Sequence, residues 1–261
     1  MMRSYSPVLS SIATMALLFT SSAFADSNPG ASTNSSPNKP SSIAIQDKQI
    51  QAYIENHPEV IYAALMKYQQ QQNQKQKDSV NTFMQQNSKQ LFEDSKDGIL
   101  GNPNGSTTIL VFSDYNCGYC RKAATILEKL IKSSPDLRVV VKQLPILGPD
   151  SNNASRIAML AQQKHIFKQV NQSLFSMEKP ISKEKLQAAM SKFGIDKVEI
   201  EKALSSKDFE NDIKQNYQLA TKLMIQGTPA LLISNKDHTK IQFIDNYLDE
   251  SNVKKIIDSL K

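Results

Sequence analysis

The most informative shortage in this sequence is cysteine, since 261 residues contain only two, Cys117 and Cys120. An exported protein that depends on a disulfide framework needs several pairs that close long loops. A bond between these two would close a very short loop, so it would remove little entropy from the unfolded chain. A zinc site would lack two of its four ligands, and the three histidines, His57, His165 and His238, are scattered. A purely structural role for the pair is therefore disfavoured.

Long apolar runs and concentrated charge are also missing. No stretch approaches eighteen consecutive apolar residues, so we expect no membrane-spanning helix in the mature chain. The formal net charge is +6, and the lysines are scattered along helical segments without alternating aromatic residues. We interpret them as solvated helix faces and expect no nucleic-acid partner.

The first 25 residues have the pattern of a secretory signal peptide. Arg3 gives the positive start, residues 12–20 form a short apolar stretch, and Ala23-Phe24-Ala25 fits a small-residue cleavage site. The apolar stretch is too short to span a membrane comfortably, and the lack of a nearby cysteine argues against a lipoprotein. We expect export, followed by a small, polar, proline-rich flexible linker at residues 26–45.

Residues 46–95 are expected to form a long helical extension. Apolar residues recur at helical spacing on both sides of a glutamine-rich segment, residues 69–77, that has no apolar face. Pro58 fits the first turn of a helix that restarts after a break. A helix over residues 59–92 would be about 50 Å long, so much of it would project or meet another chain. We favour an oligomerisation stalk over a solvated connector.

Residues 96–261 show the alternation of an α/β domain. A turn-rich hinge is expected at residues 98–105. After it, a strand, a helix and a second strand form a predicted βαβ unit with parallel strands, at residues 107–112, 117–131 and 137–142. An inserted all-helical subdomain of four or five helices is expected over about residues 150–226. The chain then ends with a predicted strand pair and a closing helix, at residues 230–234, 241–244 and 249–260.

The two cysteines lie at the start of the predicted helix, residues 117–131, which follows the first strand of the βαβ unit. A helix start has unpaired N–H groups and a partial positive charge, so the pKa of Cys117 should fall below its usual value of about 8.5. Cys120, one turn further, is close enough to bridge and better shielded. We predict a redox-active pair in which Cys117 forms the mixed disulfide and Cys120 resolves it. A Cu(I) site on the same thiolates and a non-catalytic envelope interaction protein are the alternatives.

A second motif, Gly227-Thr228-Pro229, directly precedes an apolar strand. Together with Cys117-Gly118-Tyr119-Cys120 and the helical insertion, it makes the sequence resemble the thioredoxin superfamily, within it the DsbA branch of bacterial periplasmic disulfide proteins. Further segments are similar to a subgroup with an N-terminal helical extension, as in the DsbA-like outer-membrane-associated antigen of intracellular gammaproteobacteria. These segments are residues 56–60, 101–105, 143–148 and 227–233.

The resemblance implies a thioredoxin fold and thiol–disulfide exchange with unfolded or misfolded exported proteins. It implies a cis peptide bond before Pro229, placed against the cysteine pair, with Thr228 offering backbone hydrogen bonds to an extended substrate. It also implies a membrane redox partner, a homo-oligomer (a dimer is favoured) through residues 46–92, and no cofactor or metal. The expected location is the periplasm, either free or associated with the outer membrane.

Two positions depart from the family pattern. Six residues before the first cysteine, where a buried acid often helps to move the proton of the second, this chain has Val111. Asp114 or a water would have to substitute. Strongly oxidising members also carry a histidine between the cysteines, whereas Gly118-Tyr119 is the dipeptide of the periplasmic disulfide isomerase. We therefore expect Gly118 and Tyr119 to tune the pair toward a less oxidising potential, and a dimer with paired sites would favour isomerisation.

Overall fold

The computed structural model describes residues 42–244 and 249–260. The predicted signal peptide, residues 1–25, and most of the predicted linker lie outside the described residues. By its internal contacts the chain divides into two units, residues 1–60 and 61–261. Within the described part, no helix combines the length and the hydrophobicity needed to cross a membrane.

Helices occupy the predicted extension. α1 (Ser42–Asn56) begins inside the segment expected to be linker, and α2 (Pro58–Gln86) begins at the predicted proline. A short helix, α3 (Ser88–Phe92), follows. The break before Pro58 is therefore confirmed, because a proline is tolerated in the first turn of a helix but not in its interior.

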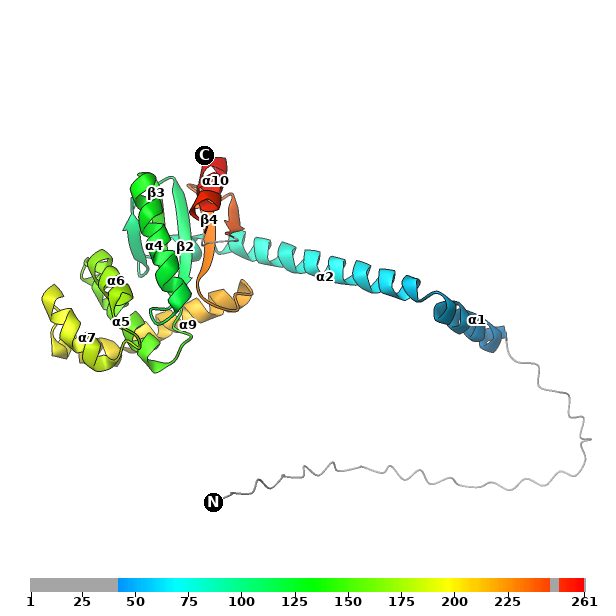
Figure 1. Cartoon of the computed structure of the whole chain (residues 1–261), viewed down its shortest axis with the longest axis horizontal. Helices are drawn as coiled ribbons and strands as arrows, with labels where there is room; N and C mark the ends of the chain where they lie inside the picture. Colours follow the sequence, from blue (N-terminus) through cyan, green and yellow to red (C-terminus); the bar gives the residue numbers. More distant parts are fainter. Residues whose placement is uncertain (1–41, 245–248, 261) are drawn as a thin grey trace, which may run out of the picture. The chain divides into compact units, whose positions relative to one another are not determined.

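The domain is built on one mixed sheet of five strands in the order β1-β3-β2-β4-β5 (Figure 1). The strands are β1 (Gly98–Gly101), β2 (Thr107–Ser113), β3 (Leu137–Gln143), β4 (Ala230–Asn235) and β5 (Ile241–Phe243). β2 and β3 are parallel and are joined through α4 (Gly118–Ser133), which confirms the predicted βαβ unit. β4 pairs antiparallel with both β2 and β5, which confirms the predicted strand pair near the C-terminus.

The helical insertion contains five α-helices and one 3₁₀ turn, in agreement with the expected four or five. They are α5 (Pro149–Gln163), α6 (Phe167–Ser176), α7 (Lys183–Met190), η1 (Ser191–Phe193), α8 (Lys197–Leu204) and α9 (Lys207–Lys222). Ser182, Asp196 and Ser206 cap the N-termini of α7, α8 and α9 with their side-chain oxygens. Such caps satisfy backbone N–H groups that have no partner within the helix, so the short helices have defined starts. α10 (Glu250–Leu260) closes the chain.

Alternate residues of the central strands face two separate cores. In β2, Ile109 and Val111 face a core shared with α4, α5 and α10. Leu110 and Phe112 face a second core, to which α3 and α9 contribute. Both faces of the sheet are therefore covered, which explains why its central strands are continuous apolar runs instead of alternating patterns.

The hinge predicted at residues 98–105 is wrong in its first half. Gly98–Gly101 form the edge strand β1, which pairs antiparallel with β3. A Cβ atom at Gly98 would lie 2.0 Å from Cζ of Phe167, so the glycine allows the ring of α6 to pack directly on the strand. Glycine inside a strand can mark a close approach of this kind as well as a turn, and the sequence alone does not distinguish the two.

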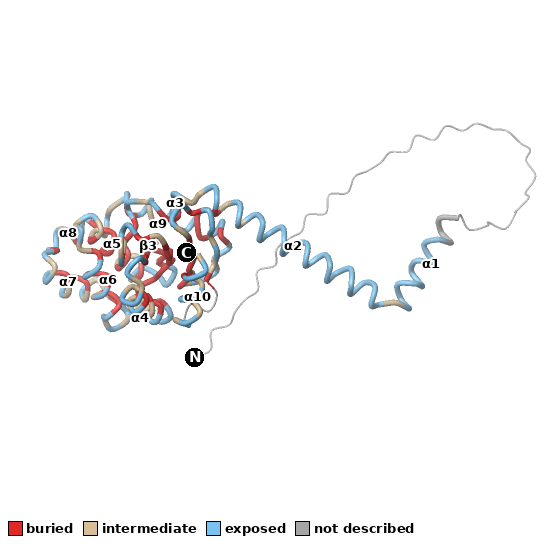
Figure 2. The backbone as a smooth tube through the Cα atoms, turned by 90° about the horizontal axis from the view of Figure 1, so that it is seen from above, coloured by how far each residue is buried: buried red, intermediate tan, exposed pale blue. Residues whose placement is uncertain are grey.

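The C-terminal end of α2 and the last two residues of α3 contribute to the second core. Met84, Leu91 and Phe92 are each at most 1% exposed. Figure 2 shows α2 exposed along most of its length before this buried end. The apolar residues that follow the glutamine-rich segment of the predicted stalk therefore pack within their own chain. This finding corrects the expectation that residues 46–92 as a whole serve oligomerisation.

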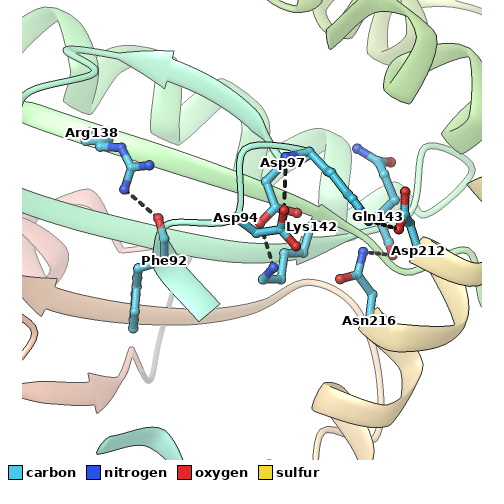
Figure 3. A network of polar contacts seen from close by, with 9 residues as sticks. Phe92, Asp94, Asp97, Arg138, Lys142, Gln143, Asp212 and Asn216 are labelled. Atoms are coloured by element: carbon cyan, nitrogen blue, oxygen red, sulfur yellow. Dashed lines mark hydrogen bonds and ion pairs between the residues drawn. The ribbon is translucent and has the colours of Figure 1, made fainter. Parts of the chain in front are cut away.

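A polar network fixes this junction to the sheet (Figure 3). Nζ of Lys142 lies 2.6 Å from Oδ2 of Asp97, and both side chains are buried. Nη1 of Arg138 donates a hydrogen bond to the carbonyl oxygen of Phe92 at 2.7 Å. Burial raises the pKa of Asp97 to about 7, although the Lys142 ammonium opposes this change. The connection between α3 and β1 is thus anchored by buried polar groups as well as by apolar contacts.

Candidate active site

Cys117 is the N-cap residue of α4, and Cys120 lies in the first turn of that helix. Sγ of Cys117 accepts a hydrogen bond from the backbone N–H of Cys120 at 3.4 Å. The Cys117 residue is 8% exposed and Cys120 is 1% exposed, and both are free thiols. Both residues are buried, and Cys117 keeps the larger exposed fraction of the two.

Thr228 and Pro229 lie against the cysteine pair, although they are more than a hundred positions away in sequence. The peptide bond between them is cis, as the resemblance implies. Sγ of Cys117 donates a hydrogen bond to the carbonyl oxygen of Thr228 at 3.2 Å. The register of the sheet causes this meeting, since Phe112 near the end of β2 pairs with Ala230 at the start of β4. The loops that carry the two motifs therefore meet at the same edge of the sheet.

The two thiols have opposite electrostatic environments. Burial raises the pKa of Cys120 to about 12. Burial also acts to raise the pKa of Cys117, but hydrogen bonds from Cys120 and the Tyr119 backbone act against it, and this pKa is lowered. Cys117 is therefore the sulfur that is more readily present as thiolate, which is the nucleophilic form.

Asp114 holds the loop in front of Cys117. Its carboxylate is fully buried and accepts hydrogen bonds from the backbone N–H groups of Asn116 at 2.8 Å and Leu147 at 2.9 Å. The backbone N–H of Asp114 donates to Sγ of Cys120 at 3.5 Å. One carboxylate oxygen binds the loop after β2 and the other binds the loop after β3, so Asp114 joins the two loops. Val111, at the position of the missing acid, lies in the apolar core.

Exposed apolar side chains lie in the first turn of α4 and on the loop after β3. Tyr119, in the dipeptide, is 58% exposed, and Nζ of Lys122 lies 5.5 Å from the centre of its ring. Leu147, whose N–H is held by Asp114, is 54% exposed, and Ile146 beside it is also exposed. A Cβ atom at Gly118 would meet no atom within 4 Å, so the space beside the dipeptide is open. Such a surface suits contact with the apolar segments of an unfolded chain.

Sequence reasoning missed the loop between α6 and α7. Arg121 donates a hydrogen bond from Nη2 to the carbonyl oxygen of Met177, and Ile181 donates its N–H to Oδ1 of Asn116 at 3.0 Å. No local pattern marks this loop as part of the site, because its contacts are to residues more than fifty positions away.

The Cu(I) alternative would use the sulfurs of Cys117 and Cys120 as its ligands. In residues 42–244 and 249–260, no group of three or more histidine, cysteine, aspartate or glutamate side chains is placed to hold a metal ion.

The fold and the reduced cysteine pair define a DsbA-like oxidoreductase of the thioredoxin type. Residues 108–250 match the family described as the DSBA-like thioredoxin domain, and this chain belongs to that family. A comparison with curated proteins found no match.

Solved structures agree with the family assignment. A thioredoxin-like oxidoreductase from Silicibacter pomeroyi is 27% identical, with a TM-score of 0.60, and the match covers 66% of this chain and 95% of that one. A periplasmic thioredoxin-like protein from Salmonella enterica serovar Typhimurium is 26% identical, with a TM-score of 0.58 over 66% of this chain and 94% of the other. Proteus mirabilis ScsC, at 24% identity, shares the fold with a TM-score of 0.61 over 83% of this chain and 97% of its own.

Proposed function

We propose that this chain forms and isomerises disulfide bonds in exported proteins by exchange at Cys117 and Cys120. The observation that carries the proposal is the position of the Cys117 sulfur. It lies at the start of α4, accepts the N–H of Cys120, and contacts the carbonyl oxygen of Thr228. The helix start and the N–H donor favour the thiolate of Cys117, while burial keeps Cys120 protonated.

In the oxidising direction, a substrate thiolate attacks Sγ of Cys117 in the enzyme disulfide. The bond between Cys117 and Cys120 breaks, a mixed disulfide forms, and Cys120 leaves as a thiolate that takes up a proton. A second substrate thiolate then attacks the substrate sulfur of the mixed disulfide and releases the Cys117 thiolate. The substrate gains one disulfide, and its two electrons remain on the enzyme dithiol. A membrane redox partner would then reoxidise the pair.

In the isomerising direction, the Cys117 thiolate attacks a wrong disulfide in the substrate and releases one substrate thiolate. That thiolate, or another, attacks elsewhere and finally frees Cys117, so no net electrons are transferred. The backbone of Thr228, preceding the cis bond to Pro229, would bind the extended substrate meanwhile. Gly118 and Tyr119 bring no cation into the dipeptide, which supports a potential that allows both directions.

We assign oligomerisation to the exposed apolar residues of α1 and the first half of α2. In α1, Ile50, Tyr53 and Ile54 recur at helical spacing and are exposed. In α2, Ile61, Leu65 and Tyr68 do the same. Apolar stripes of this kind are stabilised when a second copy covers them. A dimer would supply paired active sites, which would favour isomerisation.

Substitution of Leu65 tests this surface. Leu65→Glu should lower the mass measured by light scattering toward that of a monomer, while Gln71→Glu on the glutamine-rich, exposed part of the same helix should leave it unchanged. An unchanged mass for Leu65→Glu, or a monomeric unmodified protein, would remove the stalk from the proposal.

The redox equilibrium with glutathione tests the function itself, with the oligomeric state measured in the same sample. About 30 mV corresponds to a tenfold change in this two-electron equilibrium. We expect an oligomer whose potential is less oxidising than that of the strongly oxidising family members, and which reactivates a protein with scrambled disulfides. Cys117→Ser should abolish this activity. Persistence of activity in that variant would contradict the proposed function.

Export to the periplasm completes the proposal. It is supported by the signal-peptide pattern of residues 1–25 and by the likeness to a periplasmic thioredoxin-like protein. Membership of the subgroup with an N-terminal helical extension is supported by α1 and by the exposed part of α2. Association with the outer membrane is supported by the sequence resemblance to that subgroup alone. Fractionation of cells that produce the full chain, followed by N-terminal sequencing, would locate the protein and its cleavage site.

A further inference from the structure

The loop of residues 177–181, between α6 and α7, is anchored on both sides of Cys117. Arg121, which follows the cysteine pair, donates to the carbonyl oxygen of Met177 at the start of the loop. Asn116, which directly precedes Cys117, accepts the N–H of Ile181 at the end of the loop at 3.0 Å. Residue 179 in the middle is therefore held beside the first turn of α4.

Lys179 occupies this middle position, and its ammonium group is turned inward. Less than 1 Å² of its Nζ atom is accessible, and Nζ has no hydrogen-bond partner in the structure. The neighbouring carbonyl oxygens of Glu178 and Pro180 are instead bound from outside by Nζ of Lys185, at 3.1 Å and 3.0 Å. A buried ammonium without an acceptor is costly, so its retention at this position calls for a compensating charge.

The charged and ionisable groups with the largest effect on the pKa of Lys179 come from the cysteine segment and the first turn of α4. Burial and the guanidinium of Arg121 lower the pKa of Lys179, while Cys117, Cys120 and Asp114 act to raise it. Asp114 already accepts hydrogen bonds from two backbone N–H groups. Of the two sulfurs, Cys120 is charged only until it takes up a proton, whereas Cys117 is the one that the site favours as a thiolate in the reduced enzyme.

We propose that Lys179 is a positioning residue whose ammonium stabilises the Cys117 thiolate and so sets the redox balance of the pair. This inference rests on the proposed thiol–disulfide exchange and deepens it. The dipeptide Gly118-Tyr119 contains no cation, and Lys179 supplies one from a distant part of the sequence. Stabilising the thiolate favours the reduced enzyme, so Lys179 makes the disulfide a stronger oxidant.

Three variants of the full chain test this proposal. Lys179→Met removes the charge and keeps most of the side-chain volume. Lys179→Arg keeps the charge. Lys214→Met is the matched control, since it removes the same charge from an exposed site on α9. For each reduced protein, the pKa of Cys117 is measured from the ultraviolet absorbance of its thiolate against pH, and the glutathione equilibrium is measured separately.

We expect Lys179→Met to raise the pKa of Cys117 by roughly half a unit or more, which means about threefold less thiolate below that pKa. Its glutathione equilibrium should move toward the disulfide by a similar factor. Lys179→Arg should keep both values close to those of the unmodified protein, because it keeps the positive charge. Such a result would show that the effect of Lys179→Met comes from the lost charge and not from a damaged fold. Lys214→Met should match the unmodified protein.

An unchanged pKa of Cys117 in Lys179→Met would overturn the proposal, and so would an equal shift in Lys214→Met, which would indicate net charge instead of a local contact. Failure of the proposed function has a different signature, because the unmodified protein would then not exchange with glutathione at all. The pKa measurement does not depend on any substrate, so the two failures are distinguishable.

Discussion

Replacement of Cys117 by serine should leave a single thiol that scarcely reacts at neutral pH. Burial, the largest cause, raises the pKa of Cys120 to about 12, and burial does not depend on the neighbouring sulfur. At pH 7 the thiolate fraction of Cys120 is then about 10⁻⁵, against about 3% for an ordinary cysteine with a pKa of 8.5. Since the thiolate is the reactive form, alkylation should be slower by about three thousandfold.

The assay is alkylation of the reduced variant with iodoacetamide, quenched at intervals and followed by mass spectrometry. Cys120→Ser is the companion variant, and it should be alkylated readily at pH 7 because the pKa of Cys117 is lowered. Its rate should level off as the pH rises past that lowered value. The rate for Cys117→Ser should instead keep rising about tenfold per pH unit from pH 7 to 9, with no plateau.

The reasoning would be refuted if Cys120 in a folded Cys117→Ser variant reacted within tenfold of a free cysteine. Circular dichroism establishes that the variant is folded. The same protein in denaturant, where burial is lost, supplies the reference rate for Cys120.

Three further substitutions test how the site is supported. Lys142→Met leaves Asp97 buried without its counter-charge, so at pH 8 urea unfolding should show a loss of about 3–5 kcal/mol. Lys142 lowers the pKa of Asp97, so in the variant this pKa should lie above the value of about 7 that it has in the unmodified protein. The loss should therefore shrink as the pH falls toward 7 and level off below it, where Asp97 is protonated in both folded proteins; a loss that grows as the pH falls would contradict the assignment. Gly98→Ala places a Cβ atom against Phe167 and should cost about 1–3 kcal/mol in the same assay, and an unchanged midpoint would show that the ring moves freely. Asp114→Ala leaves two backbone N–H groups without their acceptor and should cost about 2–4 kcal/mol, with slower exchange at Cys117; full activity and stability would show that water replaces the carboxylate.

Local patterns in the sequence were sufficient for most elements of the domain. Continuous apolar runs predicted β2 and β3, and the restart of a helix at Pro58 was correctly placed. The position of Cys117 at a helix start followed from the same reasoning. These features depend on residues that are close in the chain, so hydrophobic period and capping chemistry are enough to identify them.

Features that depend on distant contacts were misread or missed. Gly98 was assigned to a turn because the ring of Phe167, which requires a glycine there, comes from another helix. Met84 was assigned to a stalk because an apolar stripe does not reveal whether its partner is the same chain or another. No sequence pattern connects Lys179 with the cysteines. Its loop is held near them by contacts with Arg121 and Asn116, which are more than fifty positions away in the chain.

The sequence by itself therefore determined the place of the two cysteines at a helix start and the motif of Thr228 and Pro229 before a strand. Tertiary structure decided which of these groups meet. The pairing of β2 with β4 brings the carbonyl oxygen of Thr228 to the Cys117 sulfur. The loop between α6 and α7, which carries a buried ammonium, is held by residues on both sides of Cys117. Intrinsic reactivity follows from local structure, but the electrostatic balance of a buried site depends on every charge around it, and only the fold places those charges.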